Sequence, residues 1–221
     1  MSGILEPILP TILSVRRLAM ADPALLRAYG ADPERHTSLG LITCDQDDST
    51  YVALDEATKH ANVDVVFAKS FYAGAAHASG PLSGEILGVI AAENPDEIEE
   101  GLRALIACLE HDACFYSAND AGDITMFPHV ISSLGRYLSA EAGLQPGDSM
   151  AYLVAPPMEH TIGLDAALKA ANVRAVMILP PPSETNFAAA FLAGTLDSCE
   201  AAASAYAEAV VGVARAPMRR W

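Results

Sequence analysis

The sequence has few aromatic residues and few positive charges. Aromatic residues make up 6% of its 221 residues, and 13 Lys and Arg stand against 28 Asp and Glu. The formal charge of −15 argues against nucleic-acid binding, because phosphates must be neutralised by clustered Lys and Arg. It is compatible with attracting small cations. Hydrophobic residues still make up 52%, many of them alanine, a composition that suits close helix packing and flat subunit contacts.

The sequence also lacks paired cysteines and long apolar runs. Four cysteines occur without any CxxC pair, at Cys44, Cys108, Cys114 and Cys199. We therefore expect buried, reduced thiols. No window reaches the roughly 18 apolar residues that a membrane span needs. The apolar N-terminus is interrupted by Pro7 and Pro10, and its charges, Arg16 and Arg17, come too late for a signal peptide. The sequence predicts a soluble, cytoplasmic protein with no membrane partner.

One pattern occurs twice in the chain. Residues Asp55–Val63, DEATKHANV, recur as Asp165–Val173, DAALKAANV, half a chain length later. Asp, Lys and Asn-Val keep their order, and each copy lies between two short apolar runs. A duplicated strand–helix–strand unit at this spacing predicts two domains rather than a solenoid. We place them at residues 1–113 and 114–221.

Hydrophobic periodicity and cap signals predict the same order of elements in both halves. In the first half we expect strands at residues 12–17, 39–43, 63–67 and 85–91, and helices at 22–29, 54–61 and 97–110. In the second half we expect strands at 114–117, 150–154, 173–179 and 187–193, and helices at 127–142, 164–171 and 197–215. A long loop at residues 70–83 follows the third strand of the first half, and a loop at residues 180–186 follows that of the second. The predicted fold class is α/β (α+β).

The repeat resembles the bacterial microcompartment shell domain. Ala57, Lys59 and Ala61-Asn62-Val63, followed by strand, loop, strand and an acidic helix start, carry the resemblance, and the second copy shows it more plainly. Specific loop motifs extend it over essentially the whole chain, to the circularly permuted tandem shell proteins of ethanolamine utilisation. These motifs are residues 38–42, 45–48, 72–77, 118–120, 151–157 and 180–186. The resemblance implies two tandem, circularly permuted microcompartment domains, each a small, mostly antiparallel sheet with helices.

The resemblance also implies a function. Such chains are structural shell proteins that form homotrimers, pseudo-hexamers of six domains. They tile with other shell proteins into the shell of a bacterial microcompartment in the cytoplasm, and their gated pores pass small molecules. No enzymatic activity and no required cofactor are implied, and cobalamin at the three-fold axis is left open. Lys59 and Lys169 fall where shell domains have a lysine near the tile edge; a solvated helix lysine is the alternative interpretation.

An aspartate cluster directly after a predicted strand is the sharpest chemical signal. Asp45, Asp47 and Asp48 could serve a small-molecule-binding regulator or a metal-dependent enzyme of the phosphotransferase type. They could also be acidic turn residues that cap the next helix, or bind a ligand in a shell protein. No phosphate-binding Ser/Thr, Lys or later acidic metal pair completes an enzyme site. We therefore favour the non-enzymatic interpretation.

By resemblance, the bound ligand is ethanolamine. Its ammonium group needs carboxylates in a partly dehydrated pocket, a role that falls to Asp47 and Glu85. The backbone near Phe115 and a second-domain loop would close the pocket at the pore through Ser183, Thr185 and Asn186. The long first-domain loop is the expected pore and gating segment, with Asp45, Phe71, Tyr72, Gly74 and His77. A lone loop histidine is usually solvated, so we expect no metal.

Overall fold

The computed structural model describes residues 5–70, 85–180 and 187–218 of the chain, which divides into two compact units. The first, here called the N-terminal unit, comprises Leu9–Ala113 and Gly135–Glu141. The second, the C-terminal unit, comprises Met1–Ile8, Cys114–Leu134 and Ala142–Trp221. Each unit therefore includes a short segment from the other half of the sequence.

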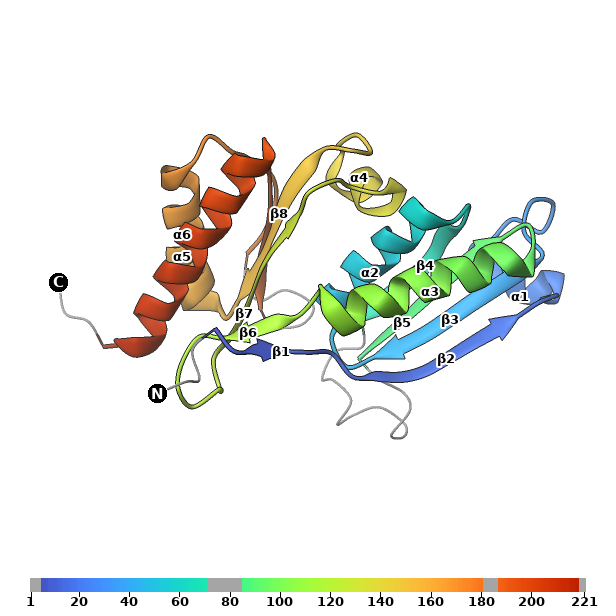
Figure 1. Cartoon of the computed structure of the whole chain (residues 1–221), viewed down its shortest axis with the longest axis horizontal. Helices are drawn as coiled ribbons and strands as arrows, with labels where there is room; N and C mark the ends of the chain where they lie inside the picture. The colour runs from blue at the N-terminus through green and yellow to red at the C-terminus, as the bar shows by residue number, and fades with distance from the viewer. Residues whose placement is uncertain (1–4, 71–84, 181–186, 219–221) are drawn as a thin grey trace. The chain divides into compact units, whose positions relative to one another are not determined.

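The N-terminal unit is built on one antiparallel sheet in the order β2-β3-β5-β4 (Figure 1). Its strands are β2 (Ile12–Leu18), β3 (Ser38–Cys44), β4 (Asp64–Ser70) and β5 (Ile86–Ala92). Its helices are α1 (Pro23–Ala28), α2 (Asp47–His60) and α3 (Pro95–His111). These elements confirm the expected order. Helix α2 begins about two turns before the predicted start, at the aspartate cluster itself.

The sheet of the N-terminal unit is covered on both faces. Glycine brings helix α3 close on one face, because a Cβ at Gly40 would lie 2.9 Å from the side chains of both Ile90 and Ile98. On the other face Leu26 of α1 packs among buried residues of the strands, including Leu39. The strand pattern SLGLITC alternates between these two faces. This explains why β3 reads as apolar throughout.

Helix α4 (Arg136–Ala142) comes from the second half of the sequence but covers α2 in the N-terminal unit. The carboxylate of Asp55 is fully buried and accepts hydrogen bonds from the backbone N–H groups of Gly135 (2.7 Å) and Leu138 (2.8 Å). The Arg136 guanidinium donates to the carbonyl oxygens of Thr58 (2.7 Å) and Val63 (2.8 Å). The Asp55 carboxylate therefore satisfies backbone N–H groups at the start of α4. Arg136 satisfies carbonyl groups in the last turn of α2 and just after it.

The C-terminal unit has an antiparallel sheet in the order β1-β6-β7-β8-β10-β9, of which Figure 1 labels β1, β6, β7 and β8. Its strands are β1 (Pro7–Ile8), β6 (Phe115–Ser117), β7 (Thr125–Ile131), β8 (Ser149–Ala155), β9 (Arg174–Leu179) and β10 (Ala188–Gly194). Helices α5 (Pro157–Ala170) and α6 (Leu196–Arg215) pack against each other and against the sheet. Both units are thus α+β, with antiparallel sheets and helices, as expected.

One predicted element is wrong. The helix expected at residues 127–142 is instead strand β7 followed by the separate helix α4. Pro128 explains the difference, because proline inside a helix costs about 3 kcal/mol. In β7 it is tolerated, since among the described residues the ladder to β6 ends at Met126, before Pro128 is reached.

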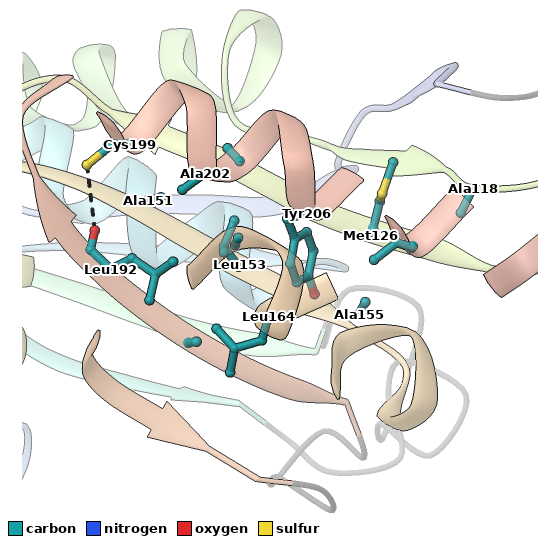
Figure 2. Packing of buried hydrophobic residues seen from close by; sticks show 14 residues of the cluster. Ala118, Met126, Ala151, Leu153, Ala155, Leu164, Leu192, Cys199, Ala202 and Tyr206 are labelled. Carbon is teal, nitrogen blue, oxygen red and sulfur yellow. Dashed lines mark hydrogen bonds between the residues drawn. The ribbon is translucent and has the colours of Figure 1, made fainter. Parts of the chain in front are cut away.

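The core of the C-terminal unit shows how the alanine-rich composition is used. Small residues of the strands and of α6 pack around Leu153, Leu164 and the fully buried ring of Tyr206 (Figure 2). Helices α5 and α6 approach closely at Gly163, where the absence of a side chain leaves room for the ring. A Cβ atom there would lie only 2.8 Å from it. Cys199 belongs to the same cluster, and its thiol donates to the Leu192 carbonyl at 3.7 Å.

The four cysteines are buried and free, which confirms the expected thiols. Burial raises the pKa of each of them, that of Cys108 to about 12, so they stay protonated near neutral pH. Over the described ranges, no helix is long and apolar enough to span a membrane.

Candidate functional site

Three predicted site residues converge at one end of the N-terminal sheet. Strands β3 and β5 are neighbours, and Cys44 pairs with Ile86, so the residues just after β3 lie beside those just before β5. The backbone N–H of Glu85 donates to the Cys44 carbonyl at 2.7 Å. Asp45 and Asp47 come directly after β3. The structure therefore brings Asp45, Asp47 and Glu85 to the same sheet end, although Glu85 comes 40 positions after Asp45 in the sequence.

Asp45 fastens the start of β2. Its Oδ1 accepts from the backbone N–H of Thr11 at 2.6 Å, and its own N–H donates to the Thr11 carbonyl at 3.2 Å. This two-way contact extends the β2–β3 pair beyond Ile12. Part of the hydrogen-bonding capacity of this carboxylate is therefore used in holding the strand.

Asp47 and Asp48 begin helix α2 and are almost fully buried. Oδ1 of Asp47 accepts from the backbone N–H of Asp48 at 2.9 Å. The positive end of the helix dipole favours negative charge at these positions. Asp47 and Asp48 therefore lie in the first turn of the helix without forming its cap, and they place buried carboxylate charge at the sheet end beside Glu85.

Tyr51 is a residue of this sheet end that sequence reasoning missed. It lies one turn after Asp47 on α2, and its hydroxyl is hydrogen-bonded to Oγ of Ser70, the last residue of β4, at 2.9 Å. Burial raises the pKa of Tyr51 to about 12, and the charges of Asp47 and Asp48 add to the effect. The phenol therefore remains a neutral hydroxyl. Its i+4 spacing from Asp47 is the signal that could have found it.

Phe115 belongs to the C-terminal unit, where it begins β6 and pairs with Ile8 of β1. Its ring lies 5.0 Å from that of Phe127. From Phe127 the aromatic contacts continue to Tyr152 at 5.4 Å and on to Phe191 at 4.4 Å. A row of buried rings thus crosses strands β6, β7, β8 and β10 and holds the Phe115 backbone in place.

The remaining predicted site residues lie outside the described residues. These are Phe71, Tyr72, Gly74 and His77 of the expected gating loop, and Ser183, Thr185 and Asn186 of the second loop. Their assignments stay predictions. Ser70 and Glu85, which flank the first of these segments, both lie at the sheet end described above.

The aspartate cluster does not form a metal centre with other described side chains. Within residues 5–70, 85–180 and 187–218, no group of three or more His, Cys, Asp or Glu could hold a metal ion. Asp45 is engaged by Thr11, and Asp47 by the start of α2. The arrangement offers buried negative charge with a neutral hydroxyl nearby, which suits a small hydroxylated cation.

Comparison with known proteins agrees with the family resemblance noted in the sequence. The family model described as "BMC domain" matches residues 38–113. The bacterial microcompartment shell protein EutL of Salmonella typhimurium is 48% identical over 216 residues, 98% of each chain. The crystal structure of ethanolamine utilization protein EutL from Leptotrichia buccalis matches with a TM-score of 0.94 and 46% identity, covering 98% of this chain and 100% of the other.

A more distant match shows the fold alone. The trimeric bacterial microcompartment shell protein PduB matches with a TM-score of 0.74 and 16% identity, over 93% of this chain and 89% of that one. The two antiparallel units and these matches define a bacterial microcompartment shell protein. Within that class, the chain belongs to the EutL family. This is a family of structural proteins of the shell and not of enzymes, which confirms the favoured interpretation of the aspartate cluster.

Proposed function

We propose that the chain is a tile of the shell around an ethanolamine-utilising microcompartment, and that its trimer carries pores that open and close for small molecules. The similarity to EutL over nearly the whole length of both chains carries this proposal. The two units of similar architecture support the geometry, because three chains supply the six units of a pseudo-hexamer. Such tiles extend into a shell through edge contacts with neighbouring shell proteins.

The tile predicts a definite mass in solution. Light scattering across the size-exclusion peak should give three times the 23.2 kDa of one chain. Electron microscopy of the concentrated protein should then show flat sheets. A stable monomer or dimer would contradict the tile, because fewer than six units cannot close the ring.

The proposal includes ethanolamine as the ligand of the N-terminal sheet end. Asp47 and Glu85 hold its ammonium group, and a buried carboxylate binds such a cation more strongly than an exposed one. The ligand-binding roles predicted by resemblance for Phe115, Ser183, Thr185 and Asn186 belong to the same proposal. Because a ligand shifts a gate only by its differential affinity, ethanolamine favours the closed pore if it binds that state more tightly. The proposal requires no cofactor.

Calorimetry tests the ligand assignment. Replacing Asp47 with Asn and Glu85 with Gln removes both charges with little change in shape, and we expect ethanolamine to bind at least tenfold more weakly. The control is Glu208→Gln, which removes an exposed carboxylate on α6 and should leave binding unchanged. Equal affinity in the double variant would reject this site while leaving the tile intact. The same titration with cobalamin tests whether the protein binds this molecule, as it would if cobalamin occupied the three-fold axis of the trimer.

A further inference from the structure

The two copies of the repeated helix differ sharply in exposure. On α2, the stripe that faces away from the sheet includes Val52 and Asp55, which are 3% and 0% exposed. At the same places in the repeat, α5 has Ile162, which is 47% exposed, and Asp165, whose side chain is 63% exposed. The same helix face is therefore covered in one unit and bare in the other.

Two further positions of this face differ between the helices both in burial and in the polarity of the side chain. Asp48 and Thr58 are 7% and 3% exposed on α2, whereas their counterparts Met158 and Leu168 are 64% and 38% exposed on α5. At these two positions a polar residue stands where the face is covered, and a large apolar residue where it is bare. Apolar side chains gathered on an uncovered helix face mark a contact surface. The outer face of α5, here Met158, Ile162, Asp165 and Leu168, fits a partner that displaces water.

The repeat indicates which element covers such a face. On α2 the cover is α4, which connects β7 to β8. The corresponding connection between β2 and β3 contains α1, and the strand pairs end alike, Leu18 opposite Leu39 and Ile131 opposite Met150. Helix α1 packs on its own sheet through Leu26. It leaves neighbouring apolar side chains on the surface, with Met20 90% and Leu25 37% exposed.

We propose that α1 and the preceding turn, residues 18–28 of one copy of the chain, cover the outer face of α5 on the next copy. Met20 and Leu25 would meet Ile162 and Leu168. This inference rests on the proposed trimer, because three such head-to-tail contacts between copies close a ring. Inside each chain α4 covers α2, and between chains α1 covers α5.

The contact between copies differs in kind from the contact within the chain. Gly135 can approach α2 only because it lacks a side chain, since a Cβ there would lie 2.5 Å from the Asp55 carbonyl oxygen. In the connection between β2 and β3, Asp22 stands at the corresponding place. The helices at the α5 contact are therefore farther apart and meet through apolar side chains. The helices at the α2 contact are close together and hydrogen-bonded. An apolar contact is also the kind expected between subunits.

The test compares two substitutions of the same kind in one unit. Leu168→Glu places a charge on the outer face of α5, and Leu196→Glu places it at the start of α6, where exposure is nearly equal at 37%. Both side chains are exposed, so circular dichroism should show folded chains. At equal protomer concentration, light scattering should show wild type and Leu196→Glu as trimers. For Leu168→Glu, the concentration of half-assembly should rise at least tenfold.

The substitution Leu25→Glu tests the occupant and should weaken assembly in the same way. If Leu168→Glu stays trimeric at the wild-type concentration, the inference is overturned while the tile stands. If Leu168→Glu dissociates and Leu25→Glu does not, some element other than α1 covers α5, and the inference is again overturned. A wild-type chain that is not trimeric would overturn the proposed tile itself.

Discussion

Replacing Asp55 with alanine is expected to lower the free energy of unfolding by about 3–5 kcal/mol. The carboxylate is fully buried, accepts from Gly135 and Leu138, and lies 3.6 Å from the ammonium of Lys59. Alanine would leave two backbone N–H groups without an acceptor, each costing about 1–3 kcal/mol. Lys59 would keep its second partner, Glu56, at 2.6 Å. The loss therefore falls mainly on the contact between α2 and α4.

Urea unfolding at a fixed protomer concentration measures this loss, because assembly makes the apparent stability concentration-dependent. The control is Glu208→Ala, which removes an exposed helix carboxylate and should change stability by no more than about 0.5 kcal/mol. A loss below about 1 kcal/mol for Asp55→Ala would mean that α4 does not depend on this carboxylate. Gly135→Ala should be as harmful, since its Cβ has no room beside Asp55.

The repeat predicted the secondary structure well because its signals are local. Asp55–Val63 and Asp165–Val173 each carry the periodicity of a helix and the apolar start of a strand within a few residues, and both assignments are confirmed. The same holds for α3, where Asn94 caps the helix through the backbone N–H groups of Asp96 and Glu97.

The predictions failed or stopped short where the deciding partner is distant in sequence. Strand β7 was mistaken for a helix, since its pairing with β8 and the short reach of β6 are not visible in the residues themselves. The burial of Asp55 depends on Gly135, 80 positions later. Matching aspartates in the repeat gave no hint that one is buried and the other exposed.

The site was predictable only in part. The resemblance pointed to Asp47 and Glu85, and the structure brings both to one sheet end through the β3–β5 pairing. Tyr51 went unnoticed, because its i+4 spacing from Asp47 indicates only a shared helix face, and its hydroxyl partner, Ser70, is not visible in the sequence.

His160 is the residue whose ionisation we expect to cost the most stability in acid. It is 2% exposed on α5, and its Nδ1 lies 2.9 Å from the hydroxyl of Tyr206. Its Nε2 has no hydrogen-bond partner among the described residues. Burial lowers the pKa of His160 to about 4 from the usual 6.5. The folded chain therefore holds this imidazole neutral.

Proton binding sets the direction of the pH effect. Between a pH of about 6.5 and about 4 the unfolded chain binds a proton that the folded chain refuses, so stability falls as the pH drops through this window. The full cost is about 3 kcal/mol below the folded pKa, and roughly 2 kcal/mol is lost between about pH 7 and pH 4.5. Above the unfolded pKa the contribution is complete and flat.

The double variant His160→Phe, Tyr206→Phe separates the contribution of His160 from that of carboxylates, which also titrate in acid. It removes both members of the buried polar pair, which is far less costly than removing one. Unfolding free energies of wild type and variant, measured in urea from about pH 7 to pH 4.5, should diverge by roughly 2 kcal/mol, with the wild type losing more. Parallel profiles would show that His160 titrates normally in the folded chain, and that its burial between α5 and α6 carries no electrostatic cost.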